Sequence, residues 1–243
     1  MDFKVGVFDS GIGGLSILSE LEKVLPNEDF YYYGDSLNNP YGEKSDEELF
    51  KITSEVVDYL INKGCKLIVI ACNTATTRCM KYLREKYQDI TFVGTVPAIK
   101  VACDREFKNT LVMATPATIE SERTSELIRD NKRKDQNIYL VSCPGLANAI
   151  ETKNEEKIKS ILQETFLPYK DKNIDTIVLG CTHYPFIKKE ILEEMPGVKL
   201  VDGSHGVSME TKRQLTENNL LDERVHERKI IIYNSLTKTK IVK

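Results

Sequence analysis

The sequence predicts an α/β protein built from doubly wound, mainly parallel sheets. Short β-branched apolar runs alternate with amphipathic helical stretches throughout the chain, which is typical of repeated β–α–β units. The apolar runs are continuous, as expected for strands that helices cover on both faces. Two of the runs end in similar motifs, which favours two similar lobes facing each other across a cleft.

The predicted strands are short runs of apolar and β-branched residues. They are residues 4–8, 30–33, 67–71, 91–94, 110–114, 138–141 and 176–179. The predicted helices lie between strands and carry apolar residues at helical spacing. They are residues 15–24, 46–63, 77–86, 120–131, 155–169 and 186–195. A helix therefore follows most strands, as crossover connections in a parallel sheet require.

Composition and charge argue against several classes of protein. Hydrophobic residues make up 41% and charged residues 29%, which is close to the globular norm. A net charge of −3, from 34 Lys+Arg and 37 Asp+Glu, gives no electrostatic case for nucleic acid or a membrane surface. No apolar run approaches the ~18 residues of a membrane helix, and no secretory signal is recognisable. We therefore expect a cytoplasmic protein with reduced thiols.

Two segments of the chain resemble each other. Residues 67–74 (Leu-Ile-Val-Ile-Ala-Cys-Asn-Thr) and 176–183 (Thr-Ile-Val-Leu-Gly-Cys-Thr-His) each give a buried strand, a small residue, a cysteine and polar side chains before a helix. Ligands of such folds bind beyond the carboxyl ends of the strands, and a helix N-terminus favours a thiolate. A lone cysteine there is usually a small buried residue. Two in matching settings, Cys72 and Cys181, indicate chemistry.

Two further segments carry groups that suit a polar ligand. The glycine-rich turn 9–14 (Asp-Ser-Gly-Ile-Gly-Gly) offers backbone amides to an anion, but it has neither the Rossmann nor the P-loop pattern, so a nucleotide is disfavoured. Asp9 would hold an ammonium group or orient a base, or simply cap the following helix. The loop 34–45 would supply amides and the Tyr41 hydroxyl, or it is merely a turn.

The remaining cysteines and histidines divide into one candidate and several structural residues. His183 lies two residues after Cys181 and could exchange a proton beside that thiol. We expect His205 and His226 at the surface. Neither Cys-x-x-Cys nor His-Glu-x-x-His occurs, so the sequence predicts no metal site. Four cysteines without a paired motif are expected to be structural, namely Cys65, Cys79, Cys103 and Cys143.

Four motifs, taken in order, resemble the glutamate racemase branch of the aspartate/glutamate racemase superfamily. They are 9–15 (Asp-Ser-Gly-Ile-Gly-Gly-Leu), 40–42 (Pro-Tyr-Gly), 71–75 (Ala-Cys-Asn-Thr-Ala) and 179–185 (Leu-Gly-Cys-Thr-His-Tyr-Pro). Together they span most of the chain. The resemblance implies interconversion of L- and D-glutamate without pyridoxal phosphate, metal or other cofactor, and a D-glutamate product that feeds peptidoglycan synthesis.

The resemblance also implies a role for particular residues. Racemisation needs one acid/base group on each face of Cα, and Cys72 and Cys181 would be those groups. Asp9 would assist Cys72, and His183 would assist Cys181. Glu151 resembles a further acidic helper, although a Glu at a helix start is usually just solvated. The positions that match substrate-holding residues are Asp9, Ser10, Tyr41, Gly42, Asn73, Thr74, Thr76, Thr118, Thr182 and His183.

The chain departs from the family pattern in two loops. Residues 114–118 read Ala-Thr-Pro-Ala-Thr where many members have Gly-Thr-x-Gly-Thr, and residues 37–39 read Leu-Asn-Asn in place of Ala-Arg-Cys. Neither change removes a proton-transfer group. By the family pattern, residues 1–97 with 207–243 form one lobe and 98–206 the other, with the active site between them, and the protein is a homodimer.

Three alternatives remain open at this point. A racemase of the same superfamily acting on aspartate or another small acid would keep both thiols, although Thr182, His183 and the Asn73–Thr74 pair favour glutamate. A non-catalytic protein would bind the amino acid without exchanging its Cα hydrogen. A thiol redox or metal sensor would respond to peroxide or zinc, and the wide sequence separation of the two cysteines disfavours it. Binding of DNA gyrase, which some members show, is neither indicated nor excluded.

Overall fold

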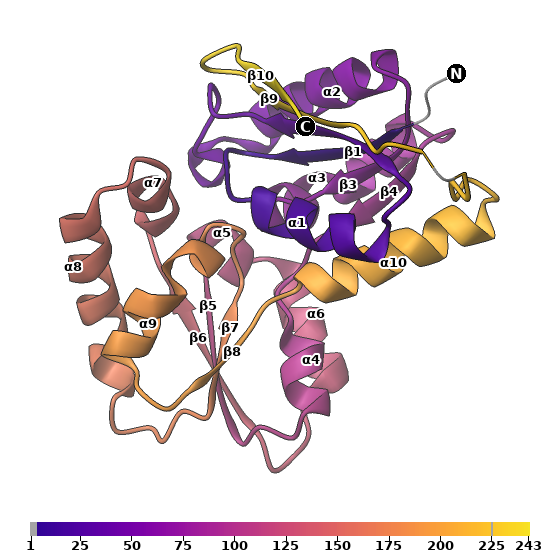
Figure 1. Cartoon of the computed structure of the whole chain (residues 1–243). Helices are drawn as coiled ribbons and strands as arrows, with labels where there is room; N and C mark the ends of the chain where they lie inside the picture. Colours follow the sequence, from indigo (N-terminus) through magenta and orange to yellow (C-terminus); the bar gives the residue numbers. More distant parts are fainter. Residues whose placement is uncertain (1–3, 225) are drawn as a thin grey trace. The chain divides into compact units, whose positions relative to one another are not determined.

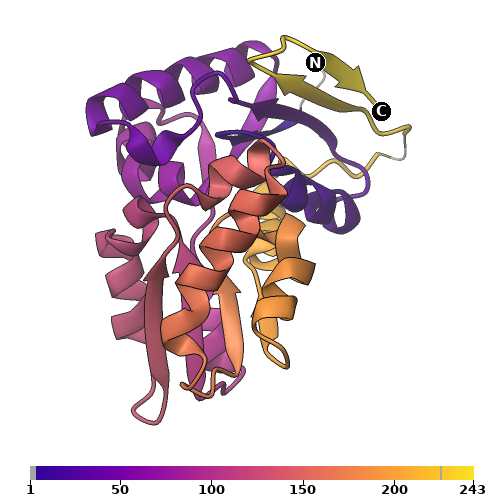
Figure 2. The ribbon, with the colours of Figure 1, turned by 90° about the vertical axis from the view of Figure 1, so that its left-hand side faces the viewer.

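The computed structural model describes residues 4–224 and 226–243. Contacts within the chain define two compact units. Unit 1 consists of the residues up to Thr95 together with Ser204–Lys243, and unit 2 is Val96–Gly203. Each unit is built on a single sheet (Figures 1 and 2). In the part of the chain that the structure describes, no helix has the length and apolar character needed to cross a membrane.

The sheet of unit 1 has six strands in the order β10-β9-β2-β1-β3-β4 (Figure 1). The strands are β1 Lys4–Asp9, β2 Asp29–Gly34, β3 Cys65–Ile70, β4 Thr91–Gly94, β9 Ile230–Asn234 and β10 Lys240–Val242. All neighbours pair in parallel except β10, which pairs antiparallel with β9. The predicted mainly parallel sheet is confirmed here.

Helices cover both faces of this sheet because its strands are apolar on both sides. On one face α1 (Leu15–Val24) and α10 (Ser204–Glu217) pack with Val5 and Val7 of β1. On the other, α2 (Asp46–Asn62) and α3 (Asn73–Lys86) pack with Phe8. The alternation along β1 follows the two-residue period of a strand. Each fully buried aliphatic or aromatic side chain contributes roughly 1.5–3 kcal/mol.

Unit 2 repeats this arrangement with a smaller sheet in the order β6-β5-β7-β8, all parallel. Its strands are β5 Asn109–Ala114, β6 Asn137–Ser142, β7 Thr176–Leu179 and β8 Lys199–Val201. Figure 2 shows α8 lying against this sheet. The helices α7 Leu146–Glu151, α8 Glu155–Phe166 and α9 Lys188–Glu194 share one apolar cluster, while α4 Ile99–Asp104 and α6 Glu122–Asn131 share the other.

Shorter helical segments connect these elements. They are the 3₁₀ turns η1 Tyr41–Glu43, η2 Leu167–Tyr169 and η3 Tyr184–Ile187, and the four-residue helix α5 Pro116–Ile119. Three predicted helices begin at other positions than expected. The helix predicted at 186–195 begins at Lys188, after the turn η3. The helix predicted at 77–86 begins at Asn73, because Cys72 serves as its N-cap. The helix predicted at 120–131 begins at Glu122, after Ser121 caps it and α5 occupies the preceding turn.

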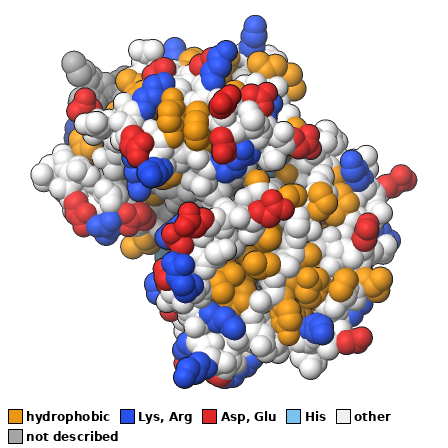
Figure 3. Space-filling model, turned by 180° about the vertical axis from the view of Figure 1, so that it is seen from behind, with side chains coloured by type: hydrophobic (Ala, Val, Ile, Leu, Met, Phe, Trp, Pro, Cys, Tyr) orange, Lys and Arg blue, Asp and Glu red, His pale blue; other side chains and the backbone are white. Residues whose placement is uncertain are grey.

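Strand β6 is an edge strand of unit 2 that leaves apolar side chains partly exposed. Its four central residues, 138–141, are half-buried. Leu167, the first residue of the turn η2, is 70% exposed. Figure 3 shows hydrophobic side chains at the surface of this unit. Edge strands can pair with another chain. The homodimer that the family resemblance implies stays a prediction.

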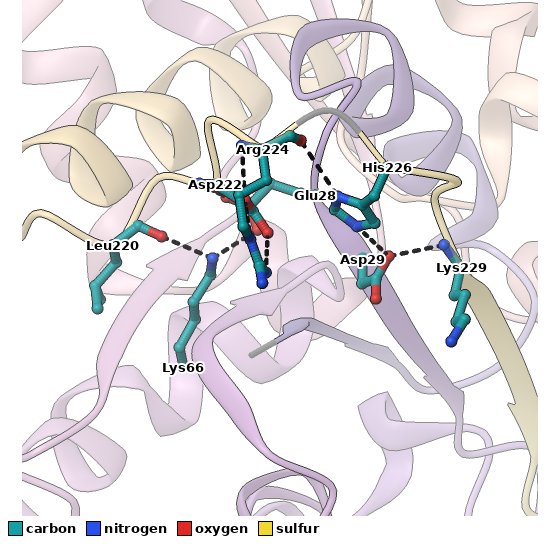
Figure 4. A network of polar contacts seen from close by, with 8 residues as sticks. All are labelled: Glu28, Asp29, Lys66, Leu220, Asp222, Arg224, His226 and Lys229. Atoms are coloured by element: carbon teal, nitrogen blue, oxygen red, sulfur yellow. Dashed lines mark hydrogen bonds and ion pairs between the residues drawn. The ribbon is translucent and has the colours of Figure 1, made fainter. Parts of the chain in front are cut away.

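A buried ion pair attaches the C-terminal segment to the amino ends of the unit 1 strands (Figure 4). Lys66 Nζ lies 2.7 Å from Glu28 Oε2, and the two side chains are only 6% and 1% exposed. The same ammonium group donates to the Leu220 carbonyl at 2.7 Å, and Glu28 Oε1 accepts from the Asp222 N–H at 2.8 Å. The pair therefore also satisfies backbone groups of the segment leading to β9.

A second acidic side chain continues this attachment. Asp29 Oδ1 accepts from the Lys229 N–H at 2.7 Å and lies 3.2 Å from His226 Nε2 (Figure 4). Arg224, hydrogen-bonded to Asp222, holds the pKa of the Asp222 carboxyl well below its usual range. These bonds place β9 against β2 and so complete the sheet. His226 and His205 are exposed, as predicted.

Replacing Lys66 by methionine is expected to destabilise unit 1 by about 3–5 kcal/mol, because it leaves the Glu28 carboxylate buried without its cation. Urea denaturation followed by circular dichroism measures this change. Lys23→Met is the matched control: Lys23 is 69% exposed and pairs with Glu20 at 3.0 Å, so its loss is expected to cost less than about 1 kcal/mol. Equal losses in the two variants would contradict the buried-pair interpretation.

Candidate active site

The first group of predicted site residues lies where β1 and β3 end. The two strands are parallel neighbours, and the Ala71 N–H donates to the Phe8 carbonyl at 2.8 Å. Asp9, the last residue of β1, is fully buried, and Cys72 follows β3 after one residue. The carboxyl ends of adjacent parallel strands meet at one sheet edge, so the fold brings Asp9 and Cys72 to the same end of unit 1.

Glycine in the turn after β1 is required by close packing. A Cβ on Gly14 would lie 2.7 Å from Asp9 Cβ and 2.9 Å from Ala71 Cβ. Asp9 Oδ2 accepts the Gly11 N–H at 3.2 Å, so its carboxylate helps to fold the turn. The N-cap position of α1 is occupied by Gly14, so Asp9 itself does not stand at that position.

Cys72 lies just ahead of a helix, as predicted, and it is the N-cap of α3. Its Sγ accepts the Ala75 N–H at 3.5 Å, and the thiol donates to Ser10 Oγ at 3.8 Å. Hydrogen-bond donors and the positive end of the helix dipole both favour the thiolate form. The side chain is 6% exposed. The sulfur is therefore hydrogen-bonded at a helix N-terminus and shielded from bulk water.

The first turn of α3 buries three predicted substrate-binding residues, but their polar groups differ. Thr76 Oγ1 donates to the Ile70 carbonyl at 3.1 Å and accepts the Thr95 N–H at 3.0 Å, so this hydroxyl mainly joins α3 to the strand ends. Asn73 Oδ1 is buried without a hydrogen-bond partner among the described residues. A buried acceptor left in this state favours a ligand donor such as an ammonium group. Thr74 is also buried.

Thr95 is a site candidate that the sequence reasoning missed. It follows β4, whose neighbour β3 leads to Cys72, and it is 3% exposed. Its Oγ1 has no hydrogen-bond partner among the described residues, as is also true of Asn73 Oδ1. Cys72 was identified by a sequence context that it shares with Cys181, and Thr95 has no such counterpart. The signal that could have identified Thr95 is a polar residue directly after the predicted strand 91–94.

Tyr41 and Gly42 lie in the 3₁₀ turn η1 and have different environments. Tyr41 is 1% exposed, and its hydroxyl donates to Asp35 Oδ2 at 2.7 Å. Burial, and then the charge of Asp35, raise the pKa of Tyr41 well above its ordinary value, so the phenol stays protonated. Gly42 is exposed, and a Cβ there would contact nothing within 4 Å. The hydrogen bond from the Tyr41 hydroxyl to Asp35 fixes the orientation of the Tyr41 ring. Asp35 is a second residue that the sequence reasoning missed.

The second group lies in unit 2, after β7. A Cβ on Gly180 would lie 2.9 Å from both Ala114 Cβ and the Met113 carbonyl, so only glycine fits between β7 and Cys181. Cys181 and Thr182 are 7% and 5% exposed. Cys181 does not share the setting of Cys72, contrary to the prediction. The Tyr184 N–H donates to its carbonyl at 3.1 Å, and the chain enters a 3₁₀ turn instead of an α-helix.

A carboxylate, an imidazole and a thiol form a chain of contacts in unit 2. His183 Nε2 lies 2.7 Å from Glu151 Oε2, and His183 Nδ1 lies 3.8 Å from Cys181 Sγ. His183 is 1% exposed. Glu151 is the last residue of α7, so the expectation that it stands at a helix start is wrong. A buried imidazole between a carboxylate and a thiol can take the thiol proton while the carboxylate stabilises the imidazolium.

Thr118 of unit 2 is fully buried in the short helix α5. Its Oγ1 accepts from the Thr115 hydroxyl at 3.0 Å, and Thr115 also caps the helix by accepting the Thr118 N–H at 3.4 Å. The altered loop 114–118 is therefore ordered by its own threonines. A role for Thr118 in substrate binding stays a prediction.

The other four cysteines have the properties of structural residues. All six cysteines are free and buried. Burial raises the pKa of Cys65 and of Cys143 to about 12 and that of Cys79 to about 11, so these thiols are protonated at neutral pH. Burial also raises the pKa of Cys103. Within residues 4–224 and 226–243, no group of three or more His, Cys, Asp or Glu side chains could hold a metal ion.

Comparison with known proteins shows which family the chain resembles. A model of the Asp/Glu/Hydantoin racemase family matches residues 16–206. The chain is 43% identical to the glutamate racemase of Clostridium perfringens strain SM101, over 98% of this chain and 93% of that protein.

Two solved structures are similar over most of the chain. One is Escherichia coli glutamate racemase in complex with L-glutamate and the activator UDP-MurNAc-Ala, with a TM-score of 0.83, 31% identity, and coverage of 96% of this chain and 89% of that chain. The other is Francisella tularensis glutamate racemase in complex with D-glutamate, with a TM-score of 0.81, 33% identity, and coverage of 96% and 88%. The predicted α/β fold is confirmed by these likenesses.

Proposed function

Because this chain belongs to the Asp/Glu/Hydantoin racemase family, we propose that it is a glutamate racemase that exchanges the Cα proton of glutamate between two cysteine thiols. The observation that carries the proposal is the contact chain Glu151–His183–Cys181 in unit 2. These contacts give the Cys181 sulfur a proton relay. Cys72 lies in unit 1, where its sulfur is hydrogen-bonded to the Ala75 N–H and to Ser10 Oγ. Similarity to glutamate racemases supports glutamate as the substrate.

The two-thiol reaction balances without any other reagent. A thiolate removes the Cα proton from one face, and the electron pair is left on Cα as a carbanion. The opposite thiol then gives its proton to the other face and becomes the thiolate. Cys72 and Cys181 thus exchange protonation states in each turnover, and the reverse reaction uses the same groups with their roles reversed. No redox step occurs, and the proposed reaction uses no cofactor.

Each thiol has neighbouring groups suited to the change of charge. For Cys72 these are the Ala75 N–H and the helix dipole, with the buried carboxylate of Asp9 at the same sheet edge. For Cys181, the His183 imidazole accepts or returns the proton, and Glu151 compensates its positive charge. The family resemblance assigns Asp9 to Cys72 and His183 to Cys181. In support of these assignments, His183 contacts Cys181, and Asp9 lies at the same sheet edge as Cys72.

The polar groups of unit 1 suit the functional groups of an amino acid. Backbone amides of the turn after β1 would bind a carboxylate, and fixed dipoles of this kind stabilise the charge that develops on removal of the Cα proton. The unpartnered Asn73 Oδ1 would accept from the ammonium group. Ser10, Thr74 and Tyr41 complete the proposed contacts of this unit, and Thr118, Thr182 and His183 those of unit 2.

The proposal is tested by following racemisation of L-glutamate, D-glutamate and L-aspartate by circular dichroism, after dialysis of the protein against a chelator. We expect both glutamate enantiomers to racemise fully and aspartate to turn over much more slowly, with no added cofactor. Faster turnover of aspartate would replace the substrate while keeping the mechanism. Absence of any turnover would favour the non-catalytic binding protein.

The proposal extends to the role of the product in the cell. Free catalytic thiols persist in a reducing compartment, which supports a cytoplasmic location. D-glutamate would then supply peptidoglycan synthesis. Deletion of the gene should make growth of the host depend on added D-glutamate, and growth without it would contradict this role.

A further inference from the structure

Asp35 is a buried carboxylate that the proposed reaction does not use. It is 1% exposed and directly follows β2. Three side chains donate to it: Tyr41 Oη at 2.7 Å, Asn38 Nδ2 at 3.0 Å and Ser235 Oγ at 2.8 Å. No Lys, Arg or His side chain pairs with it in the chain as described. A buried carboxylate held by neutral donors alone depends on each of them.

The Ser235 hydroxyl comes from the opposite end of the sequence. Ser235 follows β9, is 6% exposed, and its N–H donates to the Gly34 carbonyl at 2.9 Å. Its Oγ also accepts the Leu37 N–H at 3.0 Å. The C-terminal hairpin, residues 230–242, therefore contacts both the Asp35 carboxylate and the backbone of the loop 34–44. This hairpin lies beyond residue 206, where the family match ends.

The loop reaches the Cys72 group through Tyr41. The Tyr41 ring packs in the same buried cluster as Phe8, Cys72 and Ala75. Its hydroxyl is committed to Asp35, so the position of the ring depends on that carboxylate. Displacement of Asp35 would move the Tyr41 side chain, which packs in the same cluster as Cys72. It would also move the backbone of Gly42, the next residue.

We propose that Asp35 and Ser235 are positioning residues for substrate binding: the C-terminal hairpin, through the Ser235 hydroxyl, holds Asp35, and Asp35 holds Tyr41 and its loop in the substrate-binding conformation. The inference rests on the proposed function. The C-terminal hairpin would thus contribute to substrate binding although it carries no proton-transfer group. The effect is expected on the Michaelis constant for glutamate, since neither residue lies next to the transferred proton.

The test compares Ser235→Ala with two control variants, Ser235→Thr and Thr237→Ala. Ser235→Ala removes the hydroxyl that donates to Asp35, and we expect the KM for both glutamate enantiomers to rise about tenfold, with a smaller change in kcat. Ser235→Thr keeps a hydroxyl and should restore a KM near the wild-type value. Thr237→Ala removes an exposed hydroxyl that bonds Asn234 and Thr239 and does not contact Asp35, so its KM should equal that of the wild type.

Thermal denaturation of each variant separates positioning from folding. Partial unfolding lowers the apparent kcat and leaves KM unchanged, so an unchanged KM in Ser235→Ala overturns the inference whatever its kcat. If Ser235→Ala fails to fold, Asp35→Asn tests the same contact, because it keeps the size of the side chain and loses its charge; an unchanged KM there is equally decisive. A wild-type protein that does not racemise glutamate contradicts the proposed function instead.

Discussion

Replacing either Cys72 or Cys181 by serine is expected to lower kcat for glutamate racemisation by a factor on the order of 10²–10⁴. A serine hydroxyl has nearly the size of the thiol but is a far weaker acid, so it cannot supply the thiolate at neutral pH. Each thiol serves one face of Cα, and loss of either one interrupts both directions. The two variants should therefore lose activity to a similar extent.

Steady-state kinetics by circular dichroism measures this loss in both directions. Cys103→Ala is the matched control, because Cys103 is also a buried cysteine and lies outside the proposed site. Its kcat should stay within about twofold of the wild type, as for an ordinary small core substitution that leaves the protein folded. If only one of the two serine variants loses activity, the reaction uses a single sulfur and the two-thiol mechanism is wrong.

Replacing Glu151 by glutamine is expected to lower kcat about ten- to a hundredfold, because a hydrogen bond to a charged group is exchanged for a neutral one beside His183. The amide can still contact the imidazole, so its position is largely kept. What is lost is the negative charge that stabilises the imidazolium when Cys181 gives up its proton. The decrease in kcat therefore measures how much the charge of Glu151 contributes to proton transfer through His183.

The matched control is Glu156→Gln, an exposed carboxylate at the start of α8, which should leave kcat unchanged. A thermodynamic check is available within the same data. L- and D-glutamate have equal free energies in solution, so kcat/KM must be equal in the two directions for every active variant. A Glu151→Gln protein with wild-type kcat would show that the contact with His183 is structural only.

Most of the sheet architecture follows from local sequence patterns. The strands 91–94 and 176–179 occur where continuous apolar runs predict them, and the helix 15–24 matches its apolar periodicity. Strands β8 and β10 are three residues long, which is too short for a pattern to be distinguished from chance. The six-residue helix α7 has the same problem, so Glu151 could not be placed correctly relative to its helix.

The candidate site was predictable where a residue directly follows a strand. Asp9 and Cys72 lie at the same sheet edge because β1 and β3 are neighbours in a parallel sheet, and no single motif specifies that pairing. The contact between Asp35 and Ser235 could not be predicted, since it joins residues 200 positions apart through pairing of β9 with β2. The polar composition of the loop 34–44 gave no indication of which side chain would be buried.

The most direct test of the two-thiol account is the fate of the Cα hydrogen when the wild-type protein racemises protiated L-glutamate in D₂O, followed by proton NMR of both enantiomers at early times. Two separate sulfurs predict that the D-glutamate formed carries deuterium at Cα from its first appearance, while the remaining L-glutamate retains its proton. A D-glutamate product that keeps the original proton would show that one group both removes and returns it, and would contradict the account.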